Sequence, residues 1–373
     1  MGKKKKILIL NYEFPPLGGG AANANYYLLK EFSKYKDIEI DLVTSSIDEE
    51  KTEKFSENIT IYYLNIGKKG NLHFQSNKNL LIYSKKALSF SKKLKKEKNY
   101  DLCHAFFGIP CGYIAMKLKI PYIVSLRGSD VPFYNKRFYI LDKLVFKNLS
   151  KKIWKNAKEV VANSEGLKDL ALETYDKKEI KVIPNGIDIE EFKPKREERK
   201  GKEEKGKIKI VSTGRLIERK GFDFLIKALK GKKNFELTLV GDGPLLEELE
   251  NLSKEKSVKT NFLGMIDHKD IPEVLQKNDI FVLPSLNEGM SNAILEAMAC
   301  GLPIISTDTG GSKELVKENG FLVEKENSEN LRKILEKFEK NKKLISKKGD
   351  ISRKMAEEMK WENIAREYYK AYG

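Results

Sequence analysis

The sequence predicts an α/β protein with two doubly wound domains, each built on a parallel sheet. Short apolar runs alternate with helix-like segments in both halves of the chain, which is the pattern of parallel βαβ units. A length of 373 residues exceeds what one ordinary core holds. Small and polar residues follow the apolar runs, so strand ends carry the unusual residues, where doubly wound sheets bind ligands.

The N-terminal half opens with a buried strand at residues 6–10, followed by the loop NYEFPPLGGG and a helix expected over residues 21–32. Four later runs read as further strands: IEIDLVTS, DLCHAF, PYIVSLRG and EVVANS. Each is short, apolar and ended by small or polar residues. These features predict an N-terminal domain over residues 1–186.

The second half repeats the pattern, from a strand at residues 207–214 and a helix at 221–230. The remaining strands are expected in FELTLVGDG, TNFLGMI, DIFVLPS and PIISTD. Each precedes a turn or a helix-like segment, so this sheet is also expected to be parallel and covered on both faces. The pattern predicts a second domain over residues 187–354.

Two segments lie outside these patterns. The stretch PNGIDIEEFKPKREERKGKEEKGK joins the halves and contains a charge run without apolar periodicity, which predicts a solvated loop and a boundary near Ile187. The last residues have helical periodicity, with Trp361, Ile364 and Tyr368 on one face. We expect the segment 355–373 to pack back onto the first domain.

Composition limits the choice of partners without fixing one. The formal net charge is +17, and glutamine is found only at positions 75 and 276, a bias that resembles thermophile proteins. Such charge suits nucleic acid, anionic lipid or an anionic small substrate.

No apolar run reaches the roughly 20 residues that span a bilayer, and the first residues lack a signal-peptide pattern, so we expect a cytoplasmic protein. The scattered cysteines are expected to be buried free thiols: Cys103, Cys111 and Cys300.

Two basic residues follow the strand at 207–214. Arg215 comes directly after it, and Lys220 comes five residues later, just before a helix. An arginine offers a planar fork to phosphate oxygens and a lysine a point charge, so the ordered pair favours an anion site. The alternative is two solvated residues in a lysine-rich chain.

The segment EGMSNAILE, residues 288–296, follows another strand. Ser291 or Asn292 is expected to cap the helix that begins here, and the start of a helix presents N–H groups to an anion. Glu296 lies about one turn inside this helix and suits adjacent hydroxyls, as on a ribose. Glu288 lies in the loop and can accept hydrogen bonds from a second polyol. The arrangement matches a sugar–diphosphate–ribose ligand.

Two glycine turns give weaker signals. Residues 18–20 are three glycines before a helix, which permits close backbone approach. A dinucleotide fingerprint would need glycine where this chain has Asn23, so an NAD site is not favoured. The second turn, GDGP at residues 241–244, has an ordinary strand-to-helix turn as its alternative.

Together these segments resemble the retaining glycosyltransferase family 4, also called glycosyltransferase group 1, of the GT-B fold. Residues 284–316 are similar to that family's E-x7-E segment and the Gly-Gly turn after it. GRLIERKG, GDGP, PNGID and PPLGGG stand in the expected order. The resemblance covers nearly the whole chain. It implies two Rossmann-like domains facing across a cleft, with the acceptor on the N-terminal side and a nucleotide sugar on the C-terminal side.

The resemblance also implies roles for individual residues. Arg215 and Lys220 would bind the donor diphosphate and stabilise the leaving phosphate, and Glu288 would contact the transferred sugar, which makes these three the catalytic set. Glu296 would hold the nucleotide ribose. The other implied donor contacts are Gly19, Gly20, Gly243, Met265, Ile266, Gly289, Met290 and Ser291.

On the acceptor or sugar side, the resemblance points to His104, Arg127 and Asp130. The family often has histidine in an H-G-x-D context, whereas this chain has SLRGSD, so Arg127 occupies that place. Arginine stays protonated and cannot act as a general base. For His104 the alternative is a histidine satisfied by hydrogen bonds near the cleft.

The implied reaction transfers a sugar from a nucleotide-diphosphate sugar to an acceptor hydroxyl with retention of anomeric configuration. It needs no metal or cofactor, and UDP is favoured as the nucleotide, with GDP and ADP left open. The acceptor is unknown, with a lipid-linked molecule or a glycan both open. The alternatives are an epimerase or a phosphorylase with a similar cleft, and a basic nucleic-acid-binding protein. No pyridoxal-binding lysine segment or nucleic-acid module is recognisable, and nucleic acid is not expected as a partner.

Two basic stretches suggest a membrane surface as a further partner. Residues 80–98 and 134–158 mix lysines with large apolar residues, and basic amphipathic helices can rest on anionic lipid. The alternative is a helix that faces its own core and exposes a solvated lysine face. If the first reading holds, the protein is peripheral at the inner face of the cell membrane.

Overall fold

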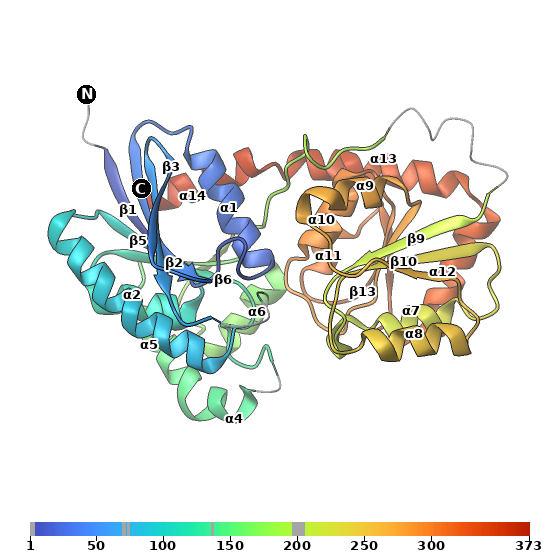
Figure 1. Cartoon of the computed structure of the whole chain (residues 1–373), viewed down its shortest axis with the longest axis horizontal. Helices are drawn as coiled ribbons and strands as arrows, with labels where there is room; N and C mark the ends of the chain where they lie inside the picture. Colours follow the sequence, from blue (N-terminus) through green and yellow to red (C-terminus); the bar gives the residue numbers. More distant parts are fainter. Residues whose placement is uncertain (1–3, 69–71, 73–74, 136–137, 196–205) are drawn as a thin grey trace. The chain divides into compact units, whose positions relative to one another are not determined.

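The computed structural model describes residues 4–68, 72, 75–135, 138–195 and 206–373 and contains two α/β units (Figure 1). One unit comprises Met1–Asn185 together with Trp361–Gly373, and the other comprises Gly186–Lys360. Most of the charge run predicted to be a solvated loop, residues 196–205, lies outside the described residues. Among the described helices, none is long and apolar enough to cross a membrane.

The first unit contains an eight-stranded sheet in the order β3-β4-β2-β1-β5-β6-β7-β8. Every neighbouring pair is parallel except the edge pair of β3 and β4. The order reverses between β1 and β5, as in a doubly wound sheet. The strands are β1 (Lys5–Leu10), β2 (Ile38–Ser46), β3 (Lys51–Ser56), β4 (Ile59–Asn65), β5 (Leu102–Phe106), β6 (Tyr122–Leu126), β7 (Glu159–Ala162) and β8 (Ile180–Val182).

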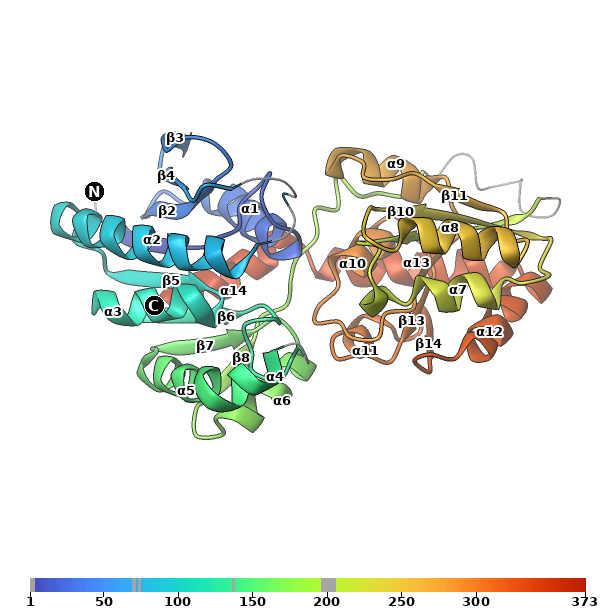
Figure 2. The same ribbon diagram turned by 60° about the horizontal axis from the view of Figure 1, so that its bottom comes forward.

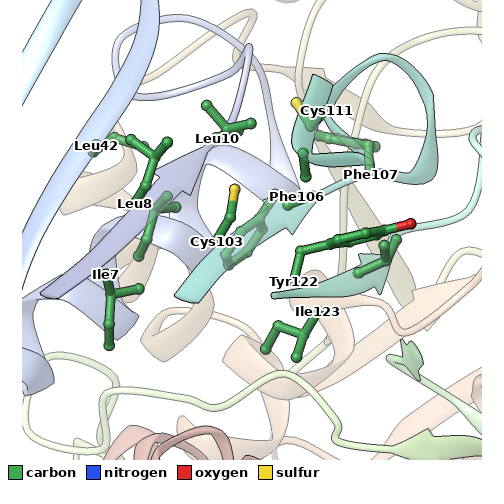
Figure 3. Packing of buried hydrophobic residues seen from close by; sticks show 14 of the residues in the cluster. Ile7, Leu8, Leu10, Leu42, Cys103, Phe106, Phe107, Cys111, Tyr122 and Ile123 are labelled. Atoms are coloured by element: carbon green, nitrogen blue, oxygen red, sulfur yellow. The ribbon is translucent and has the colours of Figure 1, made fainter. Parts of the chain in front are cut away.

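Helices cover both faces of this sheet. Helix α3 packs against both α2 and α5, and α1 packs against α14 (Figure 2). Because both faces are covered, the central strands are buried along their length, and Figure 3 shows Ile7, Leu8 and Cys103 among their side chains. The helices are α1 (Gly20–Phe32), α2 (Asn77–Glu97), α3 (Tyr113–Leu118), α4 (Tyr139–Leu141), α5 (Lys147–Asn156), α6 (Glu165–Thr174) and α14 (Trp361–Tyr372), with π-helical turns η1 (Gly108–Gly112) and η3 (Asp142–Phe146).

Aromatic side chains hold the C-terminal helix α14 on the first unit. The ring of Trp361 stacks on Tyr27 with centroids 5.9 Å apart and planes 8° apart. Tyr372 meets Phe32 at 5.4 Å. The predicted start of this segment, at residue 355, is too early, because helix α13 (Lys343–Glu358) buries Ala356 in the core of the second unit.

The second unit contains a six-stranded parallel sheet in the order β11-β10-β9-β12-β13-β14. The strands are β9 (Ile208–Thr213), β10 (Phe235–Val240), β11 (Thr260–Phe262), β12 (Ile280–Leu283), β13 (Ile304–Thr307) and β14 (Gly320–Val323). The strand order reverses between β9 and β12. Doubly wound sheets bind ligands at the carboxyl ends of the strands beside such a reversal, so the loops after β9 and β12 are where a site is expected.

The helices of the second unit follow its strands in turn. After β9 come a 3₁₀ turn and α7, after β10 comes α8, and after β12 comes α10, so each loop at the sheet's carboxyl edge leads into a helix. The elements are η4 (Glu218–Lys220), α7 (Phe222–Ala228), α8 (Leu246–Glu255), η5 (His268–Asp270), α9 (Ile271–Gln276), α10 (Asn292–Ala299), α11 (Ser312–Leu315), α12 (Ser328–Lys340) and α13. All three cysteines are buried free thiols, as predicted.

Replacing Trp361 by alanine should destabilise the first unit by about 3–5 kcal/mol, the usual cost of deleting a buried aromatic side chain. Trp361 is 6% exposed. The measurement is chemical unfolding followed by circular dichroism. Glu362→Ala, on the exposed side of the same helix, is the control and should change the stability by less than about 0.5 kcal/mol. Equal losses in the two variants would show that α14 does not depend on this packing.

Candidate functional site

A buried ion pair joins the loops after β9 and β12. Lys220 Nζ lies 2.5 Å from Glu288 Oε1, and the hydroxyl of Ser285 donates to the same oxygen at 2.8 Å. Arg219 Nη1 lies 3.9 Å from the other carboxylate oxygen. The Glu288 side chain is only 9% exposed. One carboxylate is therefore shared by two cations and a hydroxyl at the strand reversal.

The charge state of Glu288 follows from these neighbours. Burial alone would raise the pKa of this carboxyl, but the charges of Lys220 and Arg219 and the hydrogen bonds from Lys220 and Ser285 lower it more. The net result is a pKa below its ordinary value of 4.5. Glu288 is therefore ionised at neutral pH and able to accept hydrogen bonds from hydroxyl groups.

Close backbone packing fixes the position of this pair. Gly221 has φ +64°, and a Cβ on it would lie 2.3 Å from the carbonyl oxygen of Pro284. Only glycine fits both the left-handed conformation and the close approach. The N–H of Leu286 donates to the carbonyl of Arg219 at 2.8 Å. The loop that carries Lys220 is thus held against the loop that carries Glu288.

Arg215 lies in the same loop as Lys220 and is partly exposed at the carboxyl end of β9. The next residue, Leu216, donates its N–H to the Asp242 carbonyl at 2.9 Å and accepts the N–H of Leu245 at 3.1 Å. A Cβ on Gly243 would meet the Leu216 carbonyl oxygen at 2.4 Å. Gly243 therefore packs against the backbone beside Arg215 and helps to fix this loop.

Glu296 pairs with a histidine that the sequence analysis did not assign to the site. Glu296 Oε1 lies 2.9 Å from His268 Nε2, and its side chain is 12% exposed. The His268 ring also contacts Phe192, with centroids 5.4 Å apart. Burial lowers the pKa of His268, but the hydrogen bond and charge of Glu296 raise it more, so the net pKa is above its ordinary value of 6.5.

The loop after β11 carries this histidine to Glu296. Met265 is 61% exposed in this loop, and Ile266 packs partly against the core. His268 follows two residues later and opens η5. Its position soon after a strand end is the signal in the sequence that could have placed His268 at the site.

The start of α10 differs from the prediction in one respect. Ser291 occupies the N-cap position, but its side chain makes no capping hydrogen bond, so the expectation that it caps the helix is wrong for its hydroxyl. The Ser291 backbone, at φ −86° and ψ 111°, is extended as an N-cap should be. Met290 and Ser291 are buried, and the carbonyl of Gly289 packs against Gly311. A helix start without a side-chain cap suits an anionic ligand.

The glycine turn of the first unit contains an acidic residue that the sequence analysis passed over. Gly19 is the N-cap of α1, and Gly20 is its first residue. The carboxylate of Glu13 lies against Gly18. Burial raises the pKa of Glu13 to about 7, against the lowering effects of the Gly19 N–H and the Lys68 charge. An anion at this turn would therefore lie beside a carboxyl group whose pKa is raised by burial.

His104 lies in the core of the first unit. It is fully buried, with Nε2 2.7 Å from the Ser125 hydroxyl and Nδ1 2.9 Å from the Tyr372 hydroxyl. Burial and the nearby Arg127 charge hold its pKa well below the ordinary value. The expected acceptor-side role is therefore not supported, because both ring nitrogens are occupied and solvent does not reach the ring. The alternative, a hydrogen-bonded core histidine, describes it.

Arg127 and Asp130 also have structural partners. The Arg127 guanidinium donates to Asn185 Oδ1 at 2.8 Å and to the Tyr368 hydroxyl at 3.1 Å. Asp130, 8% exposed, accepts backbone N–H groups of Gly108 at 2.6 Å, and of Arg127 and Gly128 at 2.9 and 3.0 Å. Arg127 thus ties α14 to the end of β6, and Asp130 fixes the loop after that strand.

Comparison with protein families identifies the class of this chain. The model of glycosyltransferase family 4 matches residues 18–191, and the model of glycosyl transferases group 1 matches residues 194–357. The chain belongs to this family of glycosyltransferases, as the sequence analysis predicted. The match favours a glycosyltransferase over the epimerase, phosphorylase and nucleic-acid-binding alternatives.

Individual relatives agree with the family. An uncharacterized glycosyltransferase of Methanocaldococcus jannaschii is 26% identical over 374 residues, which cover 98% of this chain and 97% of the relative. The UDP-Gal:alpha-D-GlcNAc-diphosphoundecaprenol alpha-1,3-galactosyltransferase of Escherichia coli is 35% identical over 260 residues, 64% of this chain and 66% of that enzyme.

Solved structures show the same fold. Sucrose-phosphate synthase from Thermosynechococcus elongatus superposes with a TM-score of 0.85 at 20% identity and covers 99% of this chain and 98% of that one. An Anabaena protein in complex with UDP and glucose gives a TM-score of 0.72 at 20% identity, with 98% and 99% covered. The predicted GT-B fold, with two parallel-sheet α/β units, is confirmed.

Replacing Lys220 by alanine should destabilise the second unit by about 3–5 kcal/mol, because Glu288 would stay buried without its nearest cation. The pKa of Glu288 is lowered in the folded chain. The pair therefore stabilises the fold above pH 4.5 and loses this contribution as the pH falls through the folded-state pKa. Chemical unfolding at pH 7 and at a series of pH values below 4.5 measures both effects.

The control for this change is Lys227→Ala, which breaks the exposed pair with Asp223 on α7. Such surface pairs contribute about 0.3–0.5 kcal/mol. A loss in Lys220→Ala no larger than in this control would contradict the account of the buried pair.

Replacing Glu296 by glutamine should lower the pKa of His268. The amide keeps a hydrogen-bond acceptor but removes the charge, so burial then dominates. Imidazole NMR titration measures the shift, and His104, which should remain neutral between pH 5 and 8, is the internal reference. In the wild type the pair stabilises the fold below pH 6.5 and loses this contribution as the pH rises through the raised pKa. An unchanged His268 pKa in the variant would mean that the two residues are not paired.

Proposed function

We propose that the second unit binds a nucleotide-diphosphate sugar and that the enzyme transfers the sugar to an acceptor hydroxyl. The observation that carries this proposal is the buried, ionised Glu288 held by Lys220 at the strand reversal, next to the start of α10. The loops after β9 and β12 thus bring together a carboxylate that can accept hydrogen bonds from hydroxyl groups, basic side chains, and the backbone amides at the start of α10. These are the groups that a sugar joined to a diphosphate requires.

The two glutamates suit the two sugar rings of such a donor. Glu288 would accept hydrogen bonds from hydroxyl groups of the transferred sugar, and Glu296 would accept hydrogen bonds from the ribose hydroxyls. His268 occupies one oxygen of Glu296 at 2.9 Å, which fixes the carboxylate and leaves its other oxygen for the ribose. Met265, Ile266 and Gly243 lie on neighbouring strand ends and would border the base and phosphates.

The chemistry requires stabilisation of the departing phosphate. As the bond between the anomeric carbon and the phosphate oxygen breaks, negative charge grows on that oxygen. Arg215 and Lys220, together with the first amides of α10, would stabilise it by charge already in place. This arrangement needs no metal ion. We infer retention of configuration from membership of the family.

The donor nucleotide is proposed to be UDP. The E. coli relative is named for UDP-Gal, and the Anabaena neighbour was solved with UDP and with UDP-glucose. GDP and ADP are the other candidates. That Gly19 and Gly20 contact the donor stays a prediction from the family resemblance.

The acceptor is proposed to be lipid-linked. The E. coli relative is named for a diphosphoundecaprenol acceptor. We therefore place the enzyme at the inner face of the cell membrane, on anionic lipid. Of the two basic stretches, α2 fits this less well, because Tyr83 and Leu94 on its apolar face are buried in the core. The stretch around α4 and α5 carries the membrane proposal.

A panel of nucleotides and nucleotide sugars, added without metal, should raise the thermal unfolding temperature only for compounds that fill the donor site. We expect a nucleotide diphosphate to stabilise the wild type, and the stabilisation to vanish in Glu296→Ala and Arg215→Ala. Glu247→Ala removes a charge from the exposed face of α8 and is the control. If no compound stabilises the wild type, or if the variants respond as it does, the proposed donor site is wrong.

A further inference from the structure

Exposed apolar side chains gather on one short segment of the first unit. Nine large hydrophobic side chains are exposed among the described residues, and five of them fall between Tyr139 and Val145. Ile140 and Leu144 are the most exposed, at 71% and 68%. Single exposed apolar residues need no explanation, but a contiguous group marks an interaction surface. The five are Tyr139, Ile140, Leu141, Leu144 and Val145, and we call them the apolar ridge.

The ridge lies on an ordered helical element. Helix α4, the π-helical turn η3 and helix α5 follow one another without a break from residue 139 to 156, and Figure 1 shows α4 at the lower edge of its unit. Ile140 and Leu144 are four residues apart, as are Leu141 and Val145, so each pair projects from the same side of the helical element. Further along, Ile153 and Trp154 are buried and anchor α5 in the core. The ridge is therefore held outward by a fixed base.

The charge around the ridge has one sign. Residues 139–156 contain five lysines and a single acidic residue, Asp142. Asp142 is turned inward, 5% exposed, and accepts the backbone N–H of Phe133 at 2.9 Å. Lys143, Lys152 and Lys155 are exposed. The outer surface thus combines large apolar side chains with positive charge.

Helix α2 provides a contrast within the same unit. It carries many lysines as well, but its apolar side chains face the core, with Tyr83 fully buried and donating to the Val43 carbonyl at 2.9 Å. Only Leu81 is an exposed large hydrophobic residue on α2, at 64%. Basic charge alone therefore does not distinguish the two helices, and the apolar ridge does.

We propose that the apolar ridge is the membrane-inserting element of this enzyme, entering the interface of an anionic lipid bilayer while the lysines beside it contact the headgroups. Apolar burial and attraction to anionic lipid act together in such binding. The charge complementarity favours anionic lipid over a second copy of this chain, whose ridge would carry the same positive charge. The inference deepens the membrane location proposed above but does not depend on the donor site.

The first test is sedimentation of the full chain with vesicles, without donor or acceptor. We expect binding to vesicles that contain phosphatidylglycerol and at least tenfold weaker binding to phosphatidylcholine vesicles. Ile140→Ser together with Leu144→Ser should weaken binding to the anionic vesicles at least tenfold. Leu81→Ser, with matched exposure on α2, should bind as the wild type does. Because all three side chains are exposed, the thermal unfolding temperature should not change.

A second measurement locates the inserted segment directly. Cys103, Cys111 and Cys300 are buried, so a thiol-reactive, environment-sensitive fluorophore should label an introduced surface cysteine selectively. Labelled Ile140→Cys should shift its emission to the blue when anionic vesicles are added, and labelled Leu81→Cys should not. This readout holds even if the double serine variant folds poorly.

Three results would overturn the proposal. The wild type could fail to bind anionic vesicles, or the double serine variant could bind as well as the wild type. The double variant could instead change the mass of the protein in solution while vesicle binding stays the same, which would assign the ridge to contact between copies. Nucleotide stabilisation should be unaffected in every case, so failure here is distinct from failure of the donor-site proposal.

Discussion

The close contact between the loops after β9 and β12 is the constraint on which the proposed site depends. Gly221 approaches the Pro284 carbonyl so closely that no other residue fits. This contact places Lys220 beside Glu288, and the N–H of Leu286 holds the two loops together. Since the strand order reverses at the same point, the fold brings the loops together and the glycine sets their spacing. The ion pair is a consequence of this packing.

Three carboxylates of the chain show how environment sets charge. Glu288 is buried beside two cations, and its pKa is lowered. Glu13 is buried with weaker compensation from Lys68 and the Gly19 N–H, and its pKa rises to about 7. Glu296 shares its charge with His268, and the effect is seen in the raised pKa of the histidine. Two buried glutamates of one chain thus have pKa values shifted in opposite directions, and the difference lies in the cations beside them.

Much of the fold was predictable because parallel strands buried on both faces leave short apolar runs in the sequence. Strands β1, β2, β5, β6 and β7 were predicted, as were β9 to β13. Four strands were not identified. Of these, β3 is a largely exposed edge strand with the sequence KTEKFS and β8 has only three residues, whereas β4 (ITIYYLN) and β14 (GFLV) have apolar patterns that were overlooked. The start of the C-terminal segment that packs on the first unit was predicted too early, at residue 355. Both α13 and α14 have helical periodicity, and periodicity does not show which core a helix joins.

The candidate site was predictable where its residues stand at strand ends. Lys220, Glu288 and Glu296 were identified in this way, and the structure gives each a partner. Those partners were missed because the contacts join residues far apart in sequence. Arg219 and Glu288 are separated by a whole strand-helix unit and more, and His268 reaches Glu296 from another strand. Two interpretations of His104 stayed open in the sequence, because a strand-end position does not reveal whether a side chain faces solvent or the core.

The most direct test of the central claim, that Glu296 binds the ribose of a nucleotide donor, is a comparison of two ligands on two proteins. Calorimetric titration would measure the affinity of UDP and of 2′,3′-dideoxy-UDP for the wild type and for Glu296→Gln. The account predicts that the wild type prefers the ribonucleotide by about 10- to 100-fold, since a lost charge-assisted hydrogen bond costs about 1.5–3 kcal/mol, and that the variant loses most of this preference. A preference that persists undiminished in Glu296→Gln would show that the ribose binds elsewhere, and the assignment of this site would be wrong.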